Sequence, residues 1–201
     1  MSWIQVISYA ESEGRLRKLY DRVTGPNQNV DNIMMVHGLR PHTMVGHMSM
    51  YKNVLHNSNN TLPKWYLETL GVLVSILNEC EYCIEHHFSG LKRLLDDADK
   101  SNELRASLEK KKYSSKLDAK YAAGLEYAEK LTLSAHSLVE NDVVALRDSG
   151  LKDGEILEIN QVVSYFNYAN RTVLGLGVST EGDIIGLSPN NSDDESNWNH
   201  Q

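Results

Sequence analysis

A nearly continuous apolar run between Leu62 and Leu77 is the feature that most constrains the fold of this chain. Apolar residues occupy several faces of the run, which predicts a helix that is buried on most sides. Thr61 and Pro63 are typical of a helix start, where a capping residue lies close to a proline in the first turn. One acid, Glu68, stands in the middle of the run. An ionised carboxylate there is costly unless it is paired or shares a proton.

Helical periodicity continues through most of the remaining sequence. Residues 13–23 place apolar side chains at three- and four-residue spacings, and residues 43–56 and 118–133 also favour helix. Few segments alternate between polar and apolar residues, and no hairpin signal lies between two such segments. We therefore expect a single all-α helical domain over residues 1–187. Residues 188–201 are polar, acidic and repetitive, which predicts a disordered tail without a core.

Composition and charge limit the classes of partner. The chain has 201 residues, 41% of them hydrophobic, and a net charge of -7, with a pI near 5.6. It shows no basic stripe that would favour nucleic acid or an anionic membrane. No apolar run approaches the roughly 18 residues of a membrane span, and the N-terminus does not resemble a secretory leader. We expect a cytoplasmic protein with no nucleic-acid or membrane partner, in which thiols are normally reduced.

Both cysteines lie in the stretch LNECEYCIEHHFSG, residues 77–90. In a reducing compartment a CxxC pair is more typical of catalysis or metal binding than of a structural cross-link. Positions three apart in a regular helix hold β-carbons about 5–6 Å apart, too far for a disulfide at roughly 3.5–4.5 Å. We therefore expect Cys80 at the start of a helix. Unpaired N–H groups and the helix dipole at such a start favour a thiolate.

Two further residues complete the predicted site. Cys83 and His87 are four positions apart and neighbour each other on one helix face. If Asn78 and Glu79 end the preceding helix, antiparallel packing brings Glu68 against the thiols. His87, oriented by Glu68 directly or through a water, is then placed to accept a thiol proton.

The pattern Glu68-x11-Cys80-x2-Cys83-x3-His87 resembles the alkylhydroperoxidase D branch of the carboxymuconolactone decarboxylase superfamily. The likeness covers roughly residues 30 to 178. Over this range the chain resembles the subfamily of uncharacterised peroxidase-related proteins. The likeness rests on five segments that occur in order: MVHGLRPHTM, LVSILNECEYCIEHH, LDAKYAAGLEYAEKLTLSAHSL, ALRDSGLKDGEI and VVSYFNYANRTVLGLGV.

The resemblance implies an all-helical fold that forms homo-oligomers. It also implies that Cys80 and Cys83 cycle through a disulfide while the protein reduces a small hydroperoxide. A proton relay would run from Glu68 through His87 to Cys83, with Cys80 as the partner, and the sequence leaves open which cysteine meets the peroxide first. Some relatives carry a histidine between the two cysteines, where this chain has Tyr82. Tyr82 or His86 would then have to handle the second proton.

The remaining predictions concern cofactors and the polar residues of the second half of the chain. No glycine-rich dinucleotide fingerprint occurs, so we expect no cofactor and an external dithiol or a reductase as electron donor. Asn167, Asn170 and Arg171 are candidates for lining the pocket, although helix capping or subunit contacts explain them equally well. His37, His42 and His47 recur every five residues, which does not align them on one helix face, and they are interpreted as unconnected.

The same residues are also compatible with other functions. Cys80, Cys83, His87 and a distant acid are candidate ligands of an unusual zinc site, whereas a closed structural site needs four ligands and the chain has one CxxC. The same thiols would serve a non-enzymatic redox sensor or scaffold. Glu68 would equally suit a buried ion pair with a basic residue. Lactone decarboxylation, the other chemistry of the superfamily, does not use a CxxC pair.

Overall fold

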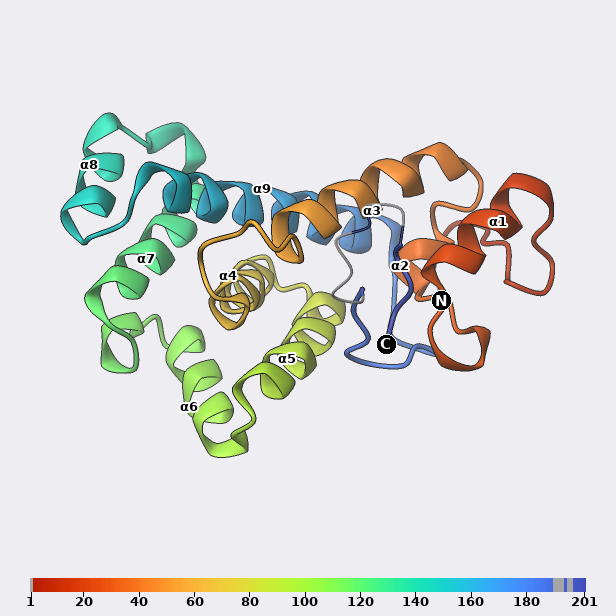
Figure 1. The fold of residues 1–201 in the computed structure, drawn as a ribbon, viewed down its shortest axis with the longest axis horizontal. Helices are drawn as coiled ribbons and strands as arrows, with labels where there is room; N and C mark the ends of the chain where they lie inside the picture. The colour runs from red at the N-terminus through yellow and green to blue at the C-terminus, as the bar shows by residue number, and fades with distance from the viewer. Residues whose placement is uncertain (1, 190–193, 195–196) are drawn as a thin grey trace.

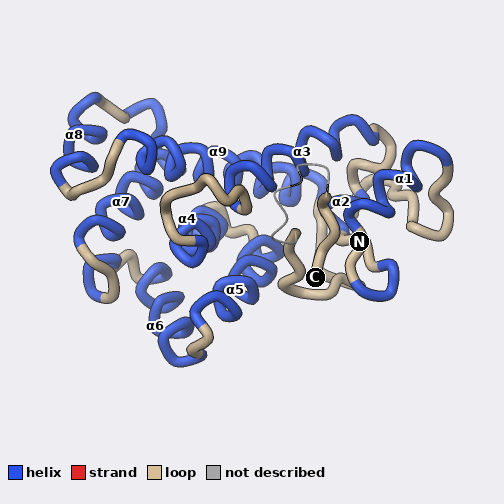
Figure 2. Tube along the Cα trace, viewed as in Figure 1, coloured by secondary structure: helices blue, strands red, loops and turns tan. Residues whose placement is uncertain are grey.

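The computed structural model describes residues 2–189, 194 and 197–201, and these residues form an all-α fold. Figure 2 shows helices joined by loops, with no strand in the described part of the chain. The α-helices are α1 (Gly14–Val23), α2 (Asn32–Met35), α3 (Pro41–Leu55), α4 (Lys64–Leu77), α5 (Glu81–Leu95), α6 (Ala98–Glu109), α7 (Ala119–Ser134), α8 (Glu140–Asp148) and α9 (Asp153–Leu176). Short 3₁₀ turns, η1 to η3, occupy Pro26–Gln28, Tyr113–Ser115 and Ala135–Ser137. The predicted fold class is confirmed.

Helix α4 is the centre of the molecule. Figure 1 shows α4 nearly end-on, and its most extensive contacts are with α5, α9 and α7. Ten consecutive residues of α4, from Tyr66 to Ser75, are buried. This confirms the buried helix predicted from the apolar run, because a helix that is apolar on several faces must be surrounded by other elements. Each large apolar side chain that is fully buried stabilises the fold by about 1.5–3 kcal/mol.

A close approach between α4 and α9 depends on Gly71. A Cβ atom at this position would collide with the ring of Phe166 on α9. The same ring meets His87 of α5 edge-on, with centroids 4.5 Å apart. Phe166 therefore packs α9 against α4 and also holds the ring of a predicted site residue.

The turn between α4 and α5 positions the two cysteines. Glu79 has a left-handed backbone, with φ of 56°. The Glu79 N–H donates to the Ile76 carbonyl (3.0 Å) and the Cys80 N–H to the Ser75 carbonyl (2.9 Å), which is the Schellman pattern of a helix end. Cys80 is then the N-cap residue of α5. The expected placement of Cys80 at a helix start is found.

The end of the chain differs from the expected tail. We call the described residues 183–189 and 197–201 the C-terminal segment. Trp198 is 2% exposed, and the Arg22 guanidinium lies 3.6 Å from the centre of its ring. The buried Lys52 ammonium donates to the Asn197 carbonyl, and Pro189 and His200 form an antiparallel bridge. One large aromatic ring buries enough apolar area to hold an otherwise polar sequence in place. The rest of the predicted tail, residues 190–193 and 195–196, lies outside the described residues.

In the part of the chain that the structure describes, no helix is both long enough and apolar enough to cross a membrane.

Candidate active site around Cys80 and Cys83

The two cysteine sulfurs lie 2.8 Å apart and are free thiols. This separation exceeds the roughly 2.03–2.05 Å of a disulfide, so the pair is in its reduced form. Cys80 is fully buried and Cys83 is 3% exposed. A hydrogen bond joins the two sulfurs. A small movement of either side chain would bring the sulfurs into bonding distance.

That hydrogen bond makes the two thiols unequal. The hydrogen bond with Cys83 lowers the pKa of Cys80, although burial acts in the opposite direction. The pKa of Cys83 is raised, first by the same bond and then by burial and by the nearby Cys80 charge. The pair therefore loses one proton more readily than two, and the remaining proton is shared between the two sulfurs.

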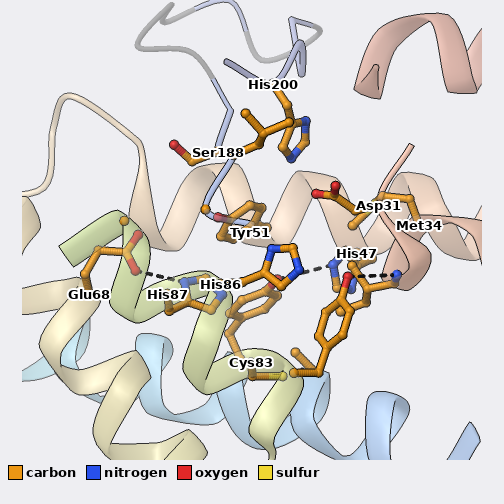
Figure 3. A pocket seen from close by; sticks show the side chains of 17 residues that line it. Asp31, Met34, His47, Tyr51, Glu68, Cys83, His86, His87, Ser188 and His200 are labelled. Carbon is orange, nitrogen blue, oxygen red and sulfur yellow. Dashed lines mark hydrogen bonds and ion pairs between the residues drawn. The ribbon is translucent and has the colours of Figure 1, made fainter. Parts of the chain in front are cut away.

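Glu68 and His87 meet as the sequence suggested. Figure 3 shows the two side chains pointing toward one another, and His87 Nδ1 lies 2.8 Å from Glu68 Oε2. The Glu68 side chain is 6% exposed and comes from the buried face of α4. Burial alone would raise the pKa of Glu68. The charge and hydrogen bond of His87, assisted by His56 and Arg93, nevertheless bring that pKa below its usual value. Glu68 is therefore an ionised partner that holds the His87 ring in one orientation.

A small internal cavity of about 50 Å³ opens beside Cys83. Cys80 is not among the described residues that line it. The polar side chains around it, besides that of Cys83, include Asp31, His47, Glu68, Tyr82, His86 and His87. Ser188 and His200 of the C-terminal segment also line this cavity, and Figure 3 shows them on the opposite side of it from Cys83. A molecule in the cavity would therefore contact Cys83 before Cys80.

Tyr82 and His86 lie next to each other and share a carboxylate. Their rings stack with centroids 4.5 Å apart. The Tyr82 hydroxyl donates to Asp183 Oδ2 at 2.6 Å, and His86 Nε2 lies 3.4 Å from the same oxygen. The Asp183 carboxylate also accepts the backbone N–H of Asn32. Asp183 comes from the loop after α9, a hundred positions away from Tyr82, and sequence spacing offers no signal for it.

The asparagines predicted on α9 form a polar layer behind the cysteines. Asn78 at the end of α4 donates to the side-chain oxygens of Asn167 (3.1 Å) and Asn170 (3.0 Å). Asn170 is fully buried, and its amide donates to Ser75 Oγ. A hydrogen bond from Asn170 also acts to lower the pKa of Cys83, against the larger effects that raise it. Arg171 donates to Asn167. None of the three α9 residues is among the described residues that line the cavity.

Two histidines interpreted as unconnected are in fact neighbours. His37 and His47 have ring centroids 5.2 Å apart, although their spacing of ten residues places them on different elements. His47 lies on α3, where its Nε2 is 3.2 Å from the Tyr165 hydroxyl. That interpretation fails because the turn between Val36 and Pro41 folds His37 back onto α3.

Sequence reasoning missed the cavity residues that come from distant elements. Asp31 precedes α2, His47 is on α3, Tyr165 is on α9, and His200 belongs to the C-terminal segment. Each of these residues is buried and polar or aromatic, and none belongs to a recognisable sequence motif. The sequence alone could have revealed them only if it had indicated which isolated polar residues are buried. Among the described residues, no three histidine, cysteine or acidic side chains are grouped so as to hold a metal ion.

A scan against protein-family models finds no match for this chain, and neither does a search of curated proteins. Solved structures do resemble it. An uncharacterised peroxidase-related protein from a Silicibacter species has a TM-score of 0.66 and 25% identity, over 75% of this chain and 76% of that chain. An uncharacterised peroxidase-related protein from Ralstonia eutropha, described as an alkylhydroperoxidase core, has a TM-score of 0.73 and 21% identity, over 89% of this chain and 91% of that chain.

The debrominase Bmp8 is also similar, with a TM-score of 0.63 and 16% identity, over 89% of this chain and 90% of that chain. A debrominase and proteins described as peroxidase-related therefore share this architecture. With its helical order and its similarity to the two peroxidase-related proteins, the chain has the alkylhydroperoxidase D-like fold.

Proposed function

We propose that this protein is a thiol-dependent hydroperoxide reductase that uses Cys83 and Cys80 as its redox pair. The observation that carries the proposal is that Cys83 faces a small buried cavity beside His87, while its sulfur lies 2.8 Å from that of Cys80. The architecture is shared with peroxidase-related proteins, which supports the same assignment.

The first half of the reaction oxidises Cys83. His87, held by the Glu68 carboxylate, accepts one proton from the thiol pair and leaves a thiolate shared between the two sulfurs. The pKa order favours the thiolate on Cys80, so the remaining proton passes from Cys83 to Cys80 along their hydrogen bond, and the Cys83 thiolate then attacks one oxygen of the hydroperoxide. An S–O bond forms, the O–O bond breaks, and the other oxygen leaves with the electron pair and takes up a proton. The products are a sulfenic acid on Cys83 and water or an alcohol.

The second half closes the disulfide and then reopens it. Cys80, after losing its proton, attacks the sulfenic sulfur, so that an S–S bond forms and the oxygen leaves as water. An external dithiol then reduces the disulfide by thiol–disulfide exchange, and two electrons return to the pair. Because a buried disulfide is hard to reach, we propose a small dithiol or a partner reductase with a protruding dithiol as the donor.

The size of the cavity favours a small hydroperoxide. A cavity needs a volume of about 10–15 Å³ to hold one water molecule. The 50 Å³ beside Cys83 therefore accommodates a few water-sized groups, such as hydrogen peroxide. A bulky alkyl chain would not fit unless the C-terminal segment moved.

Steady-state turnover of single-cysteine variants tests the proposal. With excess dithiol and hydrogen peroxide, Cys83→Ser should lose all peroxide consumption above background. Cys80→Ser should still form a sulfenic acid on Cys83, detectable by dimedone labelling and mass spectrometry, but should not form the internal disulfide. Full peroxide consumption by Cys83→Ser would contradict the proposal. Oxidation of the wild-type thiols without turnover would instead indicate a redox sensor.

A further inference from the structure

Two histidines follow Cys83 on α5, and each faces a buried carboxylate from a different part of the chain. His86 and His87 lie three and four positions after Cys83, so all three side chains fall on one face of the helix. Both histidines line the cavity together with Cys83. His87 faces Glu68 of α4, whereas His86 faces Asp183 of the C-terminal segment. The reaction proposed above uses only the first of these two pairs.

Asp183 is held in place by two hydrogen-bond donors besides His86. Its side chain is 1% exposed. It accepts the Tyr82 hydroxyl at 2.6 Å and the Asn32 backbone N–H at 3.0 and 3.1 Å. The Asn32 side chain in turn donates to the carbonyls of Ser179 and Glu181, which fixes the loop that carries Asp183. This carboxylate is therefore rigid.

His86 lies beside the Asp183 carboxylate, and one of its ring nitrogens has no hydrogen-bond partner among the described residues. The residue is 8% exposed, and its ring is stacked on that of Tyr82. Its Nε2 is buried and has no hydrogen-bond partner among the described residues, since 3.4 Å to Asp183 is too long or misaligned for a good bond. A buried polar nitrogen without a partner is uncommon and calls for an explanation. A protonated imidazole beside the Asp183 carboxylate would supply one.

We propose that His86 is the general acid of the peroxide reaction and that Asp183 is the residue that positions it. This inference rests on the proposed function. Cleavage of the O–O bond of hydrogen peroxide releases hydroxide, whose conjugate acid, water, has a pKa of about 15.7, so a proton donor at that oxygen accelerates the step. His86 gives its proton to the leaving oxygen as the Cys83 sulfur bonds to the other oxygen, and water is released. His87 has already accepted the thiol proton, so the base and the acid are two different histidines that line the same cavity as Cys83.

The division of roles predicts a dependence on the leaving group. Peracetic acid releases acetate, which resembles an Asp or Glu carboxylate with a pKa of about 4 and needs no proton. We would measure the single-turnover rate of Cys83 oxidation by rapid quenching and thiol counting, with hydrogen peroxide and with peracetic acid. His86→Gln should slow the reaction with hydrogen peroxide by about 10²–10³-fold, within the range of general acid catalysis. The reaction of the same variant with peracetic acid should stay near the wild-type rate.

Companion variants keep this test decisive. Asp183→Asn should show a smaller loss in the same direction, with the hydrogen peroxide reaction affected more than the peracetic acid reaction. His87→Gln should slow both reactions, because it impairs thiolate formation. His136→Gln makes the same chemical change at an exposed histidine and should alter neither rate. If His86→Gln does not fold, the ratio of the two rates in Asp183→Asn decides the question.

Two outcomes separate this inference from the proposed function. Equal slowing of both oxidants in His86→Gln and in Asp183→Asn would overturn the general acid role while leaving the redox pair intact. Failure of wild-type Cys83 to react with either oxidant would overturn both.

Discussion

At the scale of single residues, burial selects which histidines can take part in proton transfer. Burial is the main reason that the pKa of His47 falls to about 3 and those of His56 and His200 to about 4, so these rings are neutral at physiological pH. The two histidines that have a carboxylate within 3.4 Å are His86 and His87. Charge on a buried imidazole is tolerable only beside such a partner. The site thus contains several neutral rings and two rings that lie beside a carboxylate.

Asp31 offers a test of this electrostatic account. Burial raises its pKa from 3.8 to about 6, and the nearby Asp183 charge adds to the rise, while His86 and a hydrogen bond from Asn29 oppose it. A raised folded-state pKa contributes stability below pH 3.8 that is lost as the pH rises through about 6. The difference corresponds to about 3 kcal/mol. We therefore expect Asp31→Asn to be more stable than the wild type by up to about 3 kcal/mol at pH 8 and nearly equal to it at pH 4.

Urea unfolding of both proteins at the two pH values measures this difference. An effect of the same size at pH 4 and at pH 8 would show that Asp31 is not a buried carboxylate with a raised pKa.

At the scale of elements, the turn between α4 and α5 decides the geometry of the thiols. The sequence predicts the break at Asn78 and Glu79, the start of the next helix at Cys80 and the pairing of Glu68 with His87, because these depend on local spacing along two adjacent helices. It does not predict Asp183 or Asp31, because their approach depends on how loops far away in the chain fold back. It also does not predict that Glu79, rather than a glycine, adopts the left-handed conformation.

Glu79 is therefore a position where a substitution should stabilise the protein. Its side chain is exposed and its φ is 56°. A left-handed conformation costs a non-glycine residue about 1–2 kcal/mol. Glycine avoids this cost, but its greater freedom in the unfolded chain cancels part of the gain. We expect Glu79→Gly to raise the free energy of unfolding by about 0.5–1 kcal/mol, measured by denaturant unfolding. Glu79→Ala removes the same side chain but keeps the strain, so it serves as the control. A gain in Glu79→Ala equal to that in Glu79→Gly would contradict the conformational explanation.

At the scale of the whole molecule, the two chain termini lie at the same end, beside α1 and α2 (Figure 1). The C-terminal segment passes over the cavity there and contributes Ser188 and His200 to its lining. The acidic, polar composition of residues 188–201 predicts disorder and does not reveal the anchoring role of Trp198, because a single aromatic residue in a polar stretch gives no periodic signal. The homo-oligomer and the cytoplasmic location stay predictions.

Trp198 should therefore influence which hydroperoxides reach Cys83. Trp198→Ala removes the buried ring that anchors the C-terminal segment. We expect the rate with a bulky substrate such as cumene hydroperoxide to rise relative to the rate with hydrogen peroxide. Trp3→Ala removes a ring that is 80% exposed and is the matched control. An unchanged ratio of the two rates in Trp198→Ala would show that the C-terminal segment does not limit access.

Cys80 and Cys83 are proposed to form a working redox pair. The most direct measurement is a thiol count on the purified protein before and after one equivalent of hydrogen peroxide, and again after an external dithiol is added, with mass spectrometry of the oxidised form. The account predicts that both thiols are lost together, that the mass falls by the two hydrogens of a disulfide, and that the dithiol restores both thiols. Thiols that survive the peroxide, or that are lost without an internal disulfide, would contradict it.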